Sequence, residues 1–251
     1  MSKKHSKTLP TWLYAVRTLG LAFAIFLGAQ IAAVSILSFI GYAVGLSSDT
    51  LQWAFQSHDI VRFFLIFSIE ALTVYLVAEV LRRSSHTFAF IGLDRWPKLG
   101  DVWQAIKAYV IYFVIFISIF SVVNLSGIID TDQAQQLGFD NPAGWGLFWA
   151  FLSLVILPPL AEEILFRGYL FHTLKIRLSL AWSTIITSIL FAIAHLEFGT
   201  GGPLNFAAAL DTFVLSFVLV YVTFKTKSLW PAIFLHAIKN LIAFATLFVI
   251  K

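Results

Sequence analysis

About seven apolar runs, separated by short polar segments, dominate this chain of 251 residues. A run of about 20 apolar residues crosses a bilayer as a helix, because backbone exposed to lipid must satisfy its hydrogen bonds within the segment. The composition agrees, since 59% of the residues are hydrophobic and only 12% are charged, whereas soluble domains are about 25% charged. The sequence therefore predicts an all-α, polytopic transmembrane helix bundle of about seven spans.

The fourth predicted span differs from the others because it contains two adjacent prolines. Pro158 and Pro159 lack an N–H and disfavour a helical residue before them, so a kink or a break is expected there. The predicted spans cover residues 19–44, 60–81, 102–123, 145–175, 181–198, 204–224 and 231–251. We divide the chain into a basic cytoplasmic N-terminus (1–18), N-terminal transmembrane helices (19–144) and a segment that carries the polar motifs (145–251).

Lysine and arginine occur at alternate ends of the predicted spans. They lie in the N-terminus and in residues 82–98, 175–177 and 225–227, with Arg62 and Lys251 as exceptions. Cytoplasmic loops of membrane proteins carry the excess of these residues. The pattern predicts a multi-pass protein of the cell membrane with a cytoplasmic N-terminus. A net charge of +4 is too small and too dispersed to indicate a nucleic-acid partner.

Residues 158–168 place Glu162, Glu163 and Arg167 inside an otherwise apolar run. Each charge near the middle of a membrane costs roughly 2.5 to 3.5 kcal/mol, and such residues indicate a functional site by default. Glu163 and Arg167 are spaced i, i+4, so they project from one helical face. A purely structural ion pair is the alternative interpretation.

Two later spans carry polar residues at a similar depth. His195 lies in the fifth span, and His236 with Asn240 lies in the seventh, again at i, i+4. At about 1.5 Å of rise per residue, the motif residues lie roughly 14 to 24 Å from the cytoplasmic edge. A single intramembrane His or Asn often serves only helix packing, but three such groups at one level favour a shared site.

This set of residue types is suited to hydrolysis. A carboxylate can act as general base on a water molecule, and His236 with Asn240 offers donors for an oxyanion. Two histidines and a carboxylate can also hold a zinc ion, although the chain has no H-E-x-x-H motif. With no cysteine, thiolate metal sites and a cysteine nucleophile are excluded.

Two further charged residues have open interpretations. Glu70 in the second span is either a helix-packing residue or an accessory polar group. Lys239 lies near the middle of the seventh span, where it either snorkels to the interface or pairs with a carboxylate. Asp211 in the sixth span is the candidate partner.

The three motifs together resemble one known family. Residues 162–167 resemble the E-E-x-x-x-R motif of the CPBP intramembrane proteases, which comprise type II CAAX prenyl endopeptidases and bacteriocin-processing or immunity proteins (the Abi family). Residues 191–195 match the family's F-x-x-x-H motif, and residues 236–240 match its H-x-x-x-N motif. The resemblance covers about residues 145–251, which would then hold the catalytic helices. One departure is Ser216, where a glycine is expected.

The resemblance implies a role for each matching residue. Glu162 would activate the water with help from His195, and His236 with Asn240 would stabilise the oxyanion. Glu163 and Arg167 would support them. Family members are commonly called metalloproteases, while a metal-free glutamate mechanism is also argued, so a divalent metal such as zinc stays open as a cofactor.

The sequence thus predicts an intramembrane endopeptidase that cleaves a peptide bond of a membrane-associated or lipid-modified peptide. Its partners would be that peptide or protein substrate and the lipid bilayer. The alternative is a non-enzymatic bacteriocin-immunity or membrane-interaction protein of the same fold. A transporter that uses Glu70, Glu162 and Glu163 as a proton relay is a further alternative.

Overall fold

The computed structural model describes residues 9–130, 133, 138–196 and 203–250, and these contain helices but no strands. Of the predicted segments, residues 1–8 of the basic N-terminus and most of the turn after the fifth span lie outside the described residues. The α-helices are α1 (Thr11–Ala43), α2 (Ser48–Ser57), α3 (Asp59–Arg83), α4 (Leu99–Ser126), α5 (Trp145–Phe151), α6 (Leu157–Glu163), α7 (His172–Leu174), α8 (Leu180–Ala194), α9 (Phe206–Thr226) and α10 (Trp230–Phe244). A 3-10 helix, η1 (Phe88–Ile91), and three π-helical segments, η2 (Leu152–Ile156), η3 (Ile164–Phe171) and η4 (Ala245–Val249), complete the fold.

Six helical segments of the described chain are long and apolar enough to cross a membrane, and the apolar α8 is shorter. The predicted polytopic helix bundle is therefore confirmed. Its first helix is longer than predicted, because α1 already begins at Thr11. The loop after it contains a helix that was not predicted, α2. Ser47 caps the N-terminus of α2, because its side-chain oxygen accepts a hydrogen bond from the backbone N–H of Thr50.

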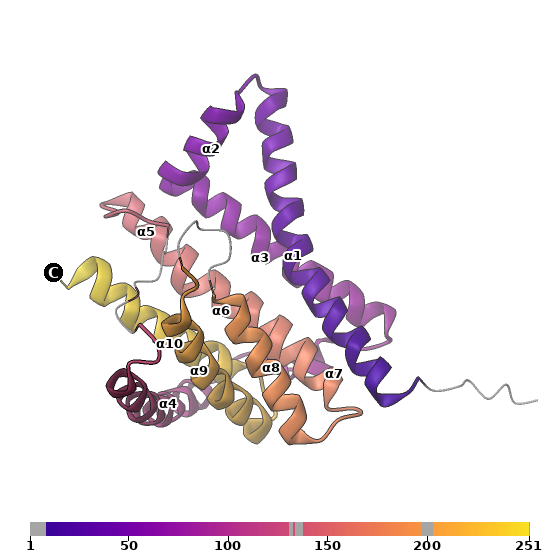
Figure 1. Ribbon diagram of the computed structural model, residues 1–251. Coiled ribbons are helices and arrows are strands. Elements are labelled where there is room, and N and C mark those ends of the chain that lie inside the picture. Colours follow the sequence, from indigo (N-terminus) through magenta and orange to yellow (C-terminus); the bar gives the residue numbers. More distant parts are fainter. Residues whose placement is uncertain (1–8, 131–132, 134–137, 197–202, 251) are drawn as a thin grey trace, which may run out of the picture.

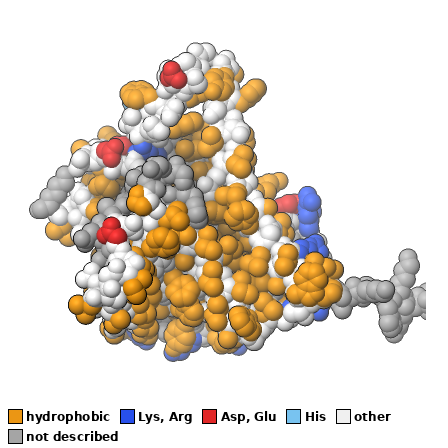
Figure 2. Space-filling model, viewed as in Figure 1, with side chains coloured by type: hydrophobic (Ala, Val, Ile, Leu, Met, Phe, Trp, Pro, Cys, Tyr) orange, Lys and Arg blue, Asp and Glu red, His pale blue; other side chains and the backbone are white. Residues whose placement is uncertain are grey.

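The surface separates by residue type along the molecule. Figure 2 shows hydrophobic side chains over most of the visible face, with most Lys and Arg at its lower and right-hand edges and a few scattered Asp and Glu. Side chains that face lipid are apolar, whereas charged side chains lie near the two membrane–water interfaces. A bundle with its axis across a bilayer accounts for this distribution.

The helices pack around the segment that carries the two glutamates. In Figure 1, α1, α2 and α3 lie on one side of the segment α5–α7, and α4, α9 and α10 lie on the other. The described core has two main apolar clusters, one joining α1, α3 and η3 and the other joining α4, α9 and α10. The polar motifs therefore lie between two apolar layers.

The motif-bearing segment is helical from Trp145 to Leu174, so the chain does not leave the helix at the proline pair. The expected irregularity takes the form of two wider π-helical stretches, η2 before the prolines and η3 after Glu163. In η2 the N–H of Leu157 bonds the carbonyl of Leu152, five residues back. Prolines and π-helical turns both mark irregular places in helices. π-Helical turns also occur frequently at functional sites.

Candidate functional site

Glu163 and Arg167 form a fully buried ion pair. Arg167 donates from Nη1 to Oε1 of Glu163 over 2.8 Å, and neither side chain has any exposed surface. The guanidinium also lies 4.1 Å from the ring centroid of Phe191 in α8, as a cation–π contact. Nε and Nη2 of Arg167 have no hydrogen-bond partner among the described residues. The pair thus anchors the motif helix against α8.

His236 of α10 lies between the two glutamates. Its Nδ1 is 3.0 Å from Oε1 of Glu163, and its Nε2 is 4.0 Å from Oε2 of Glu162. The residue is 4% exposed. The structure therefore joins two of the three sequence motifs directly, through Oε1 of Glu163, which Arg167 and His236 both contact.

Glu162 is the less constrained of the two carboxylates. Its side chain keeps 19% of its surface exposed, and Oε2 has no hydrogen-bond partner among the described residues. Glu70 lies in α3, which packs against α6. The two interpretations of Glu70, as a helix-packing residue or as an accessory polar group, both stay predictions. A carboxylate oxygen that has no hydrogen-bond partner and lies beside a histidine is suited to holding a water molecule.

His195 follows the last residue of α8 and is oriented by its own helix. Its Nδ1 lies 2.8 Å from the carbonyl oxygen of Phe191, which fixes Nδ1 as the protonated nitrogen and leaves Nε2 as an acceptor. The Phe191 ring lies between the site histidines, with centroids 4.6 Å from His195 and 5.8 Å from His236. Among the described residues no direct hydrogen bond joins His195 to Glu162, so a bridging water would be needed to connect them.

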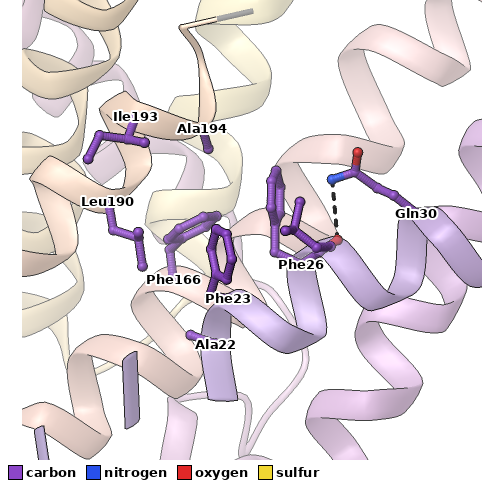
Figure 3. Close-up of a pocket in the computed structure, with 9 residues that line it drawn as sticks. Ala22, Phe23, Phe26, Gln30, Phe166, Leu190, Ile193 and Ala194 are labelled. Atoms are coloured by element: carbon purple, nitrogen blue, oxygen red, sulfur yellow. Dashed lines mark hydrogen bonds between the residues drawn. The ribbon is translucent and has the colours of Figure 1, made fainter. Parts of the chain in front are cut away.

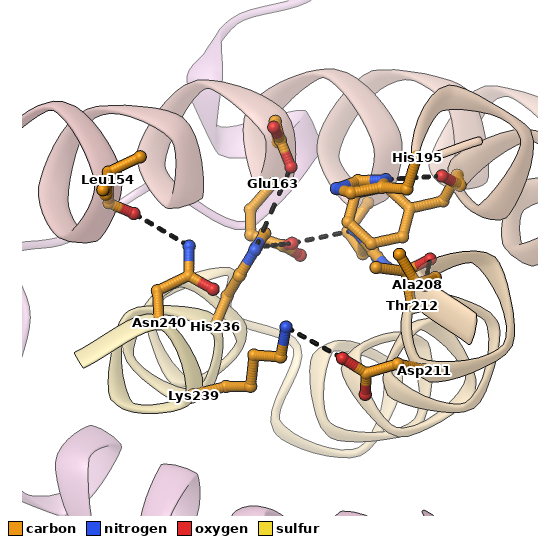
Figure 4. Close-up of polar contacts among 12 residues, drawn as sticks. Leu154, Glu163, His195, Ala208, Asp211, Thr212, His236, Lys239 and Asn240 are labelled. Carbon is orange, nitrogen blue, oxygen red and sulfur yellow. Dashed lines mark hydrogen bonds and ion pairs between the residues drawn. The ribbon is translucent and has the colours of Figure 1, made fainter. Parts of the chain in front are cut away.

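Asn240 binds a backbone carbonyl that the proline pair leaves without a helical donor. Its Nδ2 donates to the oxygen of Leu154 over 2.9 Å (Figure 4). In an α-helix this carbonyl would accept from residue 158, and in a π-helix from residue 159. Both are prolines and cannot donate. Asn240 therefore satisfies a partly buried acceptor, and the second hydrogen of its amide stays available.

The arrangement of the possible ligand side chains bears on whether the site could hold a metal ion. Among the described residues, no three His, Asp or Glu side chains converge as a group that could hold a metal ion. The predicted option of a zinc site does not fit these side chains as they are placed.

An apolar cavity of about 530 Å³ lies beside the site (Figure 3). Its walls come from α1, η3 and α8, and Gln30 supplies the one side-chain amide, which is bonded to the carbonyl of Phe26. Phe166 lines the cavity and packs edge-on against Phe191, with 5.0 Å between the ring centroids. Ala194, next to His195, lines it too. The cavity is thus separated from the polar cluster by a wall of aromatic rings.

The fold and the site define a polytopic helical membrane protein with a buried Glu–His–Arg cluster. Residues 144–242 match the family described as Type II CAAX prenyl endopeptidase Rce1-like. The resemblance to the CPBP family is confirmed over this segment, which holds all three motifs. Comparison with curated proteins and with solved structures gave no match. The family indicates intramembrane protease activity of the CAAX-protease type.

Proposed function

We propose that the chain is an intramembrane endopeptidase that hydrolyses a peptide bond of a membrane-associated or lipid-modified peptide. The observation that carries the proposal is the position of His236 between the two glutamates. Glu163 forms an ion pair with Arg167, whereas Oε2 of Glu162 has no hydrogen-bond partner among the described residues. A purely structural ion pair would need no second carboxylate beside it. The family match over residues 144–242 supports the same class of reaction.

In the proposed reaction Glu162 is the general base. It takes a proton from a water molecule, whose oxygen attacks the carbonyl carbon of the scissile bond. Glu163 is the less suitable base, because Arg167 and His236 contact its Oε1 and its side chain has no exposed surface. When the C–N bond breaks, Glu162 returns the proton to the leaving amine nitrogen, so the products are a carboxylic acid and an amine.

The other motif residues are proposed to orient the water and stabilise the oxyanion. The free Nε2 of His195 can accept a hydrogen bond from the attacking water. Asn240 offers its second amide hydrogen to the oxyanion of the tetrahedral intermediate, since the first is held by Leu154. Donors fixed in a site from which water is largely excluded are worth more than in water. The proposed mechanism uses no metal, because the donor set does not converge on one.

The substrate class is proposed from the surroundings of the site. The cavity between α1 and α8 is apolar and lies in helices that are long enough to span a membrane or lie beside those that are. The hydrocarbon part of a lipid-modified or membrane-embedded peptide would fit there.

The decisive experiment compares membrane peptides from cells that make the wild type, Glu162→Gln or Glu79→Gln. Mass spectrometry is expected to find cleavage products with the wild type and with Glu79→Gln, and none with Glu162→Gln. Glu79 is the matched control, because it pairs with Arg82 and Arg83 at the far end of α3. Insertion of each variant is checked by its yield in the membrane fraction.

Unchanged products with Glu162→Gln would contradict the proposed mechanism. Absence of any wild-type product, together with bacteriocin protection that survives Glu162→Gln, would favour a non-enzymatic immunity protein. Metal analysis of the purified wild type tests the remaining question of a bound cation.

A further inference from the structure

A second polar cluster, partly buried, joins α4, α9 and α10. Lys239 Nζ lies 2.9 Å from Oδ2 of Asp211, and the hydroxyl of Tyr112 donates to the other oxygen of that carboxylate. Lys239 and Asp211 are 19% and 18% exposed. The prediction that Asp211 is the partner of Lys239 is confirmed, whereas Tyr112 had no signal in the sequence.

The cluster holds α10 at the same turn as the site residues. Lys239 lies between His236 and Asn240 in the helix, and Figure 4 shows Asn240 turned toward Leu154 and Lys239 turned toward Asp211. Neighbours three or four apart on a helix share a face, so a rotation that moves Lys239 also moves His236. Contacts on two sides of α10 thus fix its rotation about its axis.

Stability alone does not explain such a pair. Charges inside membrane spans are rare and costly. Replacing a buried ion pair by apolar residues of similar volume is often neutral or stabilising, and the best-attested use of a retained pair is to fix one arrangement. The surrounding cluster of α4, α9 and α10 is otherwise apolar and would accept such residues.

Asp211 also compensates the charge of Lys239. The two side chains are 2.9 Å apart, and Lys239 directly precedes Asn240 in α10. Arg167, the cation of the motif helix, is fully buried and paired with Glu163. Each of these two cations thus has its own carboxylate partner.

We propose that Tyr112, Asp211 and Lys239 form a positioning cluster that fixes the rotation of α10 and thereby the placement of His236 and Asn240 against the glutamates. The inference rests on the proposed function for its kinetic consequence, but its geometric part is independent of any reaction. None of the three residues contacts the substrate in this role.

The geometric part is tested by NMR of protein labelled with ¹⁵N-histidine in detergent micelles. The ring signals of His236, one of six histidines, are assigned by their loss in His236→Gln. Asp211→Asn and Lys239→Met are expected to shift these signals, and Lys239→Arg is expected to keep them. Asp101→Asn is the matched control, because Asp101 forms an ion pair with Arg95 over 2.7 Å at the start of α4, away from the motif residues.

The kinetic part uses an S-farnesylated fluorogenic peptide with protein in liposomes. Asp211→Asn and Lys239→Met are expected to lower kcat at least tenfold with KM little changed, and Lys239→Arg to restore most of it. Unchanged His236 signals in Asp211→Asn would overturn the proposal whatever the activity. If the wild type cleaves nothing while the signals shift as expected, the proposed function fails and the positioning cluster stands.

Discussion

At the residue scale, the carboxylate of Glu163 has two hydrogen-bond partners among the described residues. That of Glu162 has none, and His236 approaches it only to 4.0 Å. Oε1 of Glu163 is contacted by Arg167 at 2.8 Å and by His236 at 3.0 Å, whereas Oε2 of Glu162 has no hydrogen-bond partner in the described structure. Adjacent glutamates project from an α-helix about 100° apart, which follows from 3.6 residues per turn. This divergence gives identical side chains different surroundings and supports different roles for them.

The buried pair leads to a prediction on stability. Arg167→Met is expected to lower the free energy of unfolding by about 3 to 5 kcal/mol, because it leaves the carboxylate of Glu163 buried without its cation. Thermal or SDS unfolding in micelles measures the loss. Arg167→Lys would restore only part of it, since an ammonium group does not stack on Phe191 as the planar guanidinium does.

A matched surface pair provides the control for that experiment. Arg82→Met removes an ion pair to Glu79 whose arginine is 74% exposed, so stability should hardly change. Adding Glu163→Gln to Arg167→Met should recover part of the lost stability, because the uncompensated charge is then gone. A loss in Arg167→Met no larger than that in Arg82→Met would contradict the assignment of a buried ion pair.

At the element scale, the motif helix depends on a group supplied by another helix. The prolines remove both N–H groups that could reach the carbonyl of Leu154, and Asn240 replaces them from α10. The π-helical stretch η2 just before the prolines is part of the same adjustment. The irregular helix and the asparagine therefore form one structural unit.

Asn240→Ala is expected to lower the free energy of unfolding by about 1 to 3 kcal/mol, because a partly buried acceptor loses its donor. Pro158→Ala in the same chain should recover much of this loss, since residue 158 then has an N–H to give to Leu154. Chemical unfolding of the two single variants and the double variant measures the coupling. Pro231→Ala, at the start of α10, serves as the control proline and should rescue nothing. Additive losses in the Pro158 and Asn240 variants would refute the coupling.

At the scale of the whole molecule, the charge pattern and the helix order support a proposed orientation. Basic residues end the spans on one side, and Figure 2 shows them at the edges of the apolar surface. We propose a cytoplasmic N-terminus, with α2 on the opposite side. The division of the chain at about residue 145 is a proposal of the same kind.

Labelling of introduced cysteines tests this orientation, and the absence of native cysteine makes the readout clean. In intact cells, a membrane-impermeant maleimide is expected to react with Ser48→Cys, at the start of α2, and to spare Lys227→Cys, just after α9. Opening the cells should make Lys227→Cys reactive as well. The reverse pattern would invert the proposed topology.

Much of the fold and part of the site could be predicted from the sequence. The spans follow from apolar length, and the pairing of Glu163 with Arg167 follows from i, i+4 spacing. The link of Tyr112 to Asp211 could not be predicted, because neighbours in space depend on how helices pack. The carbonyl of Leu154 is a different case. The two prolines indicate that it lacks a donor within its own helix, but the sequence does not indicate that Asn240 supplies one.

The bond from Asn240 to Leu154 joins residues 86 positions apart, which sets an order of assembly. At about 5 to 20 residues per second, synthesis passes Leu154 and then takes roughly another 4 to 17 s to reach Asn240. During that interval the helix holds an unsatisfied carbonyl, and His236 is absent from the carboxylates. Under the proposed function, the set of catalytic residues is complete only when insertion of the chain is nearly finished.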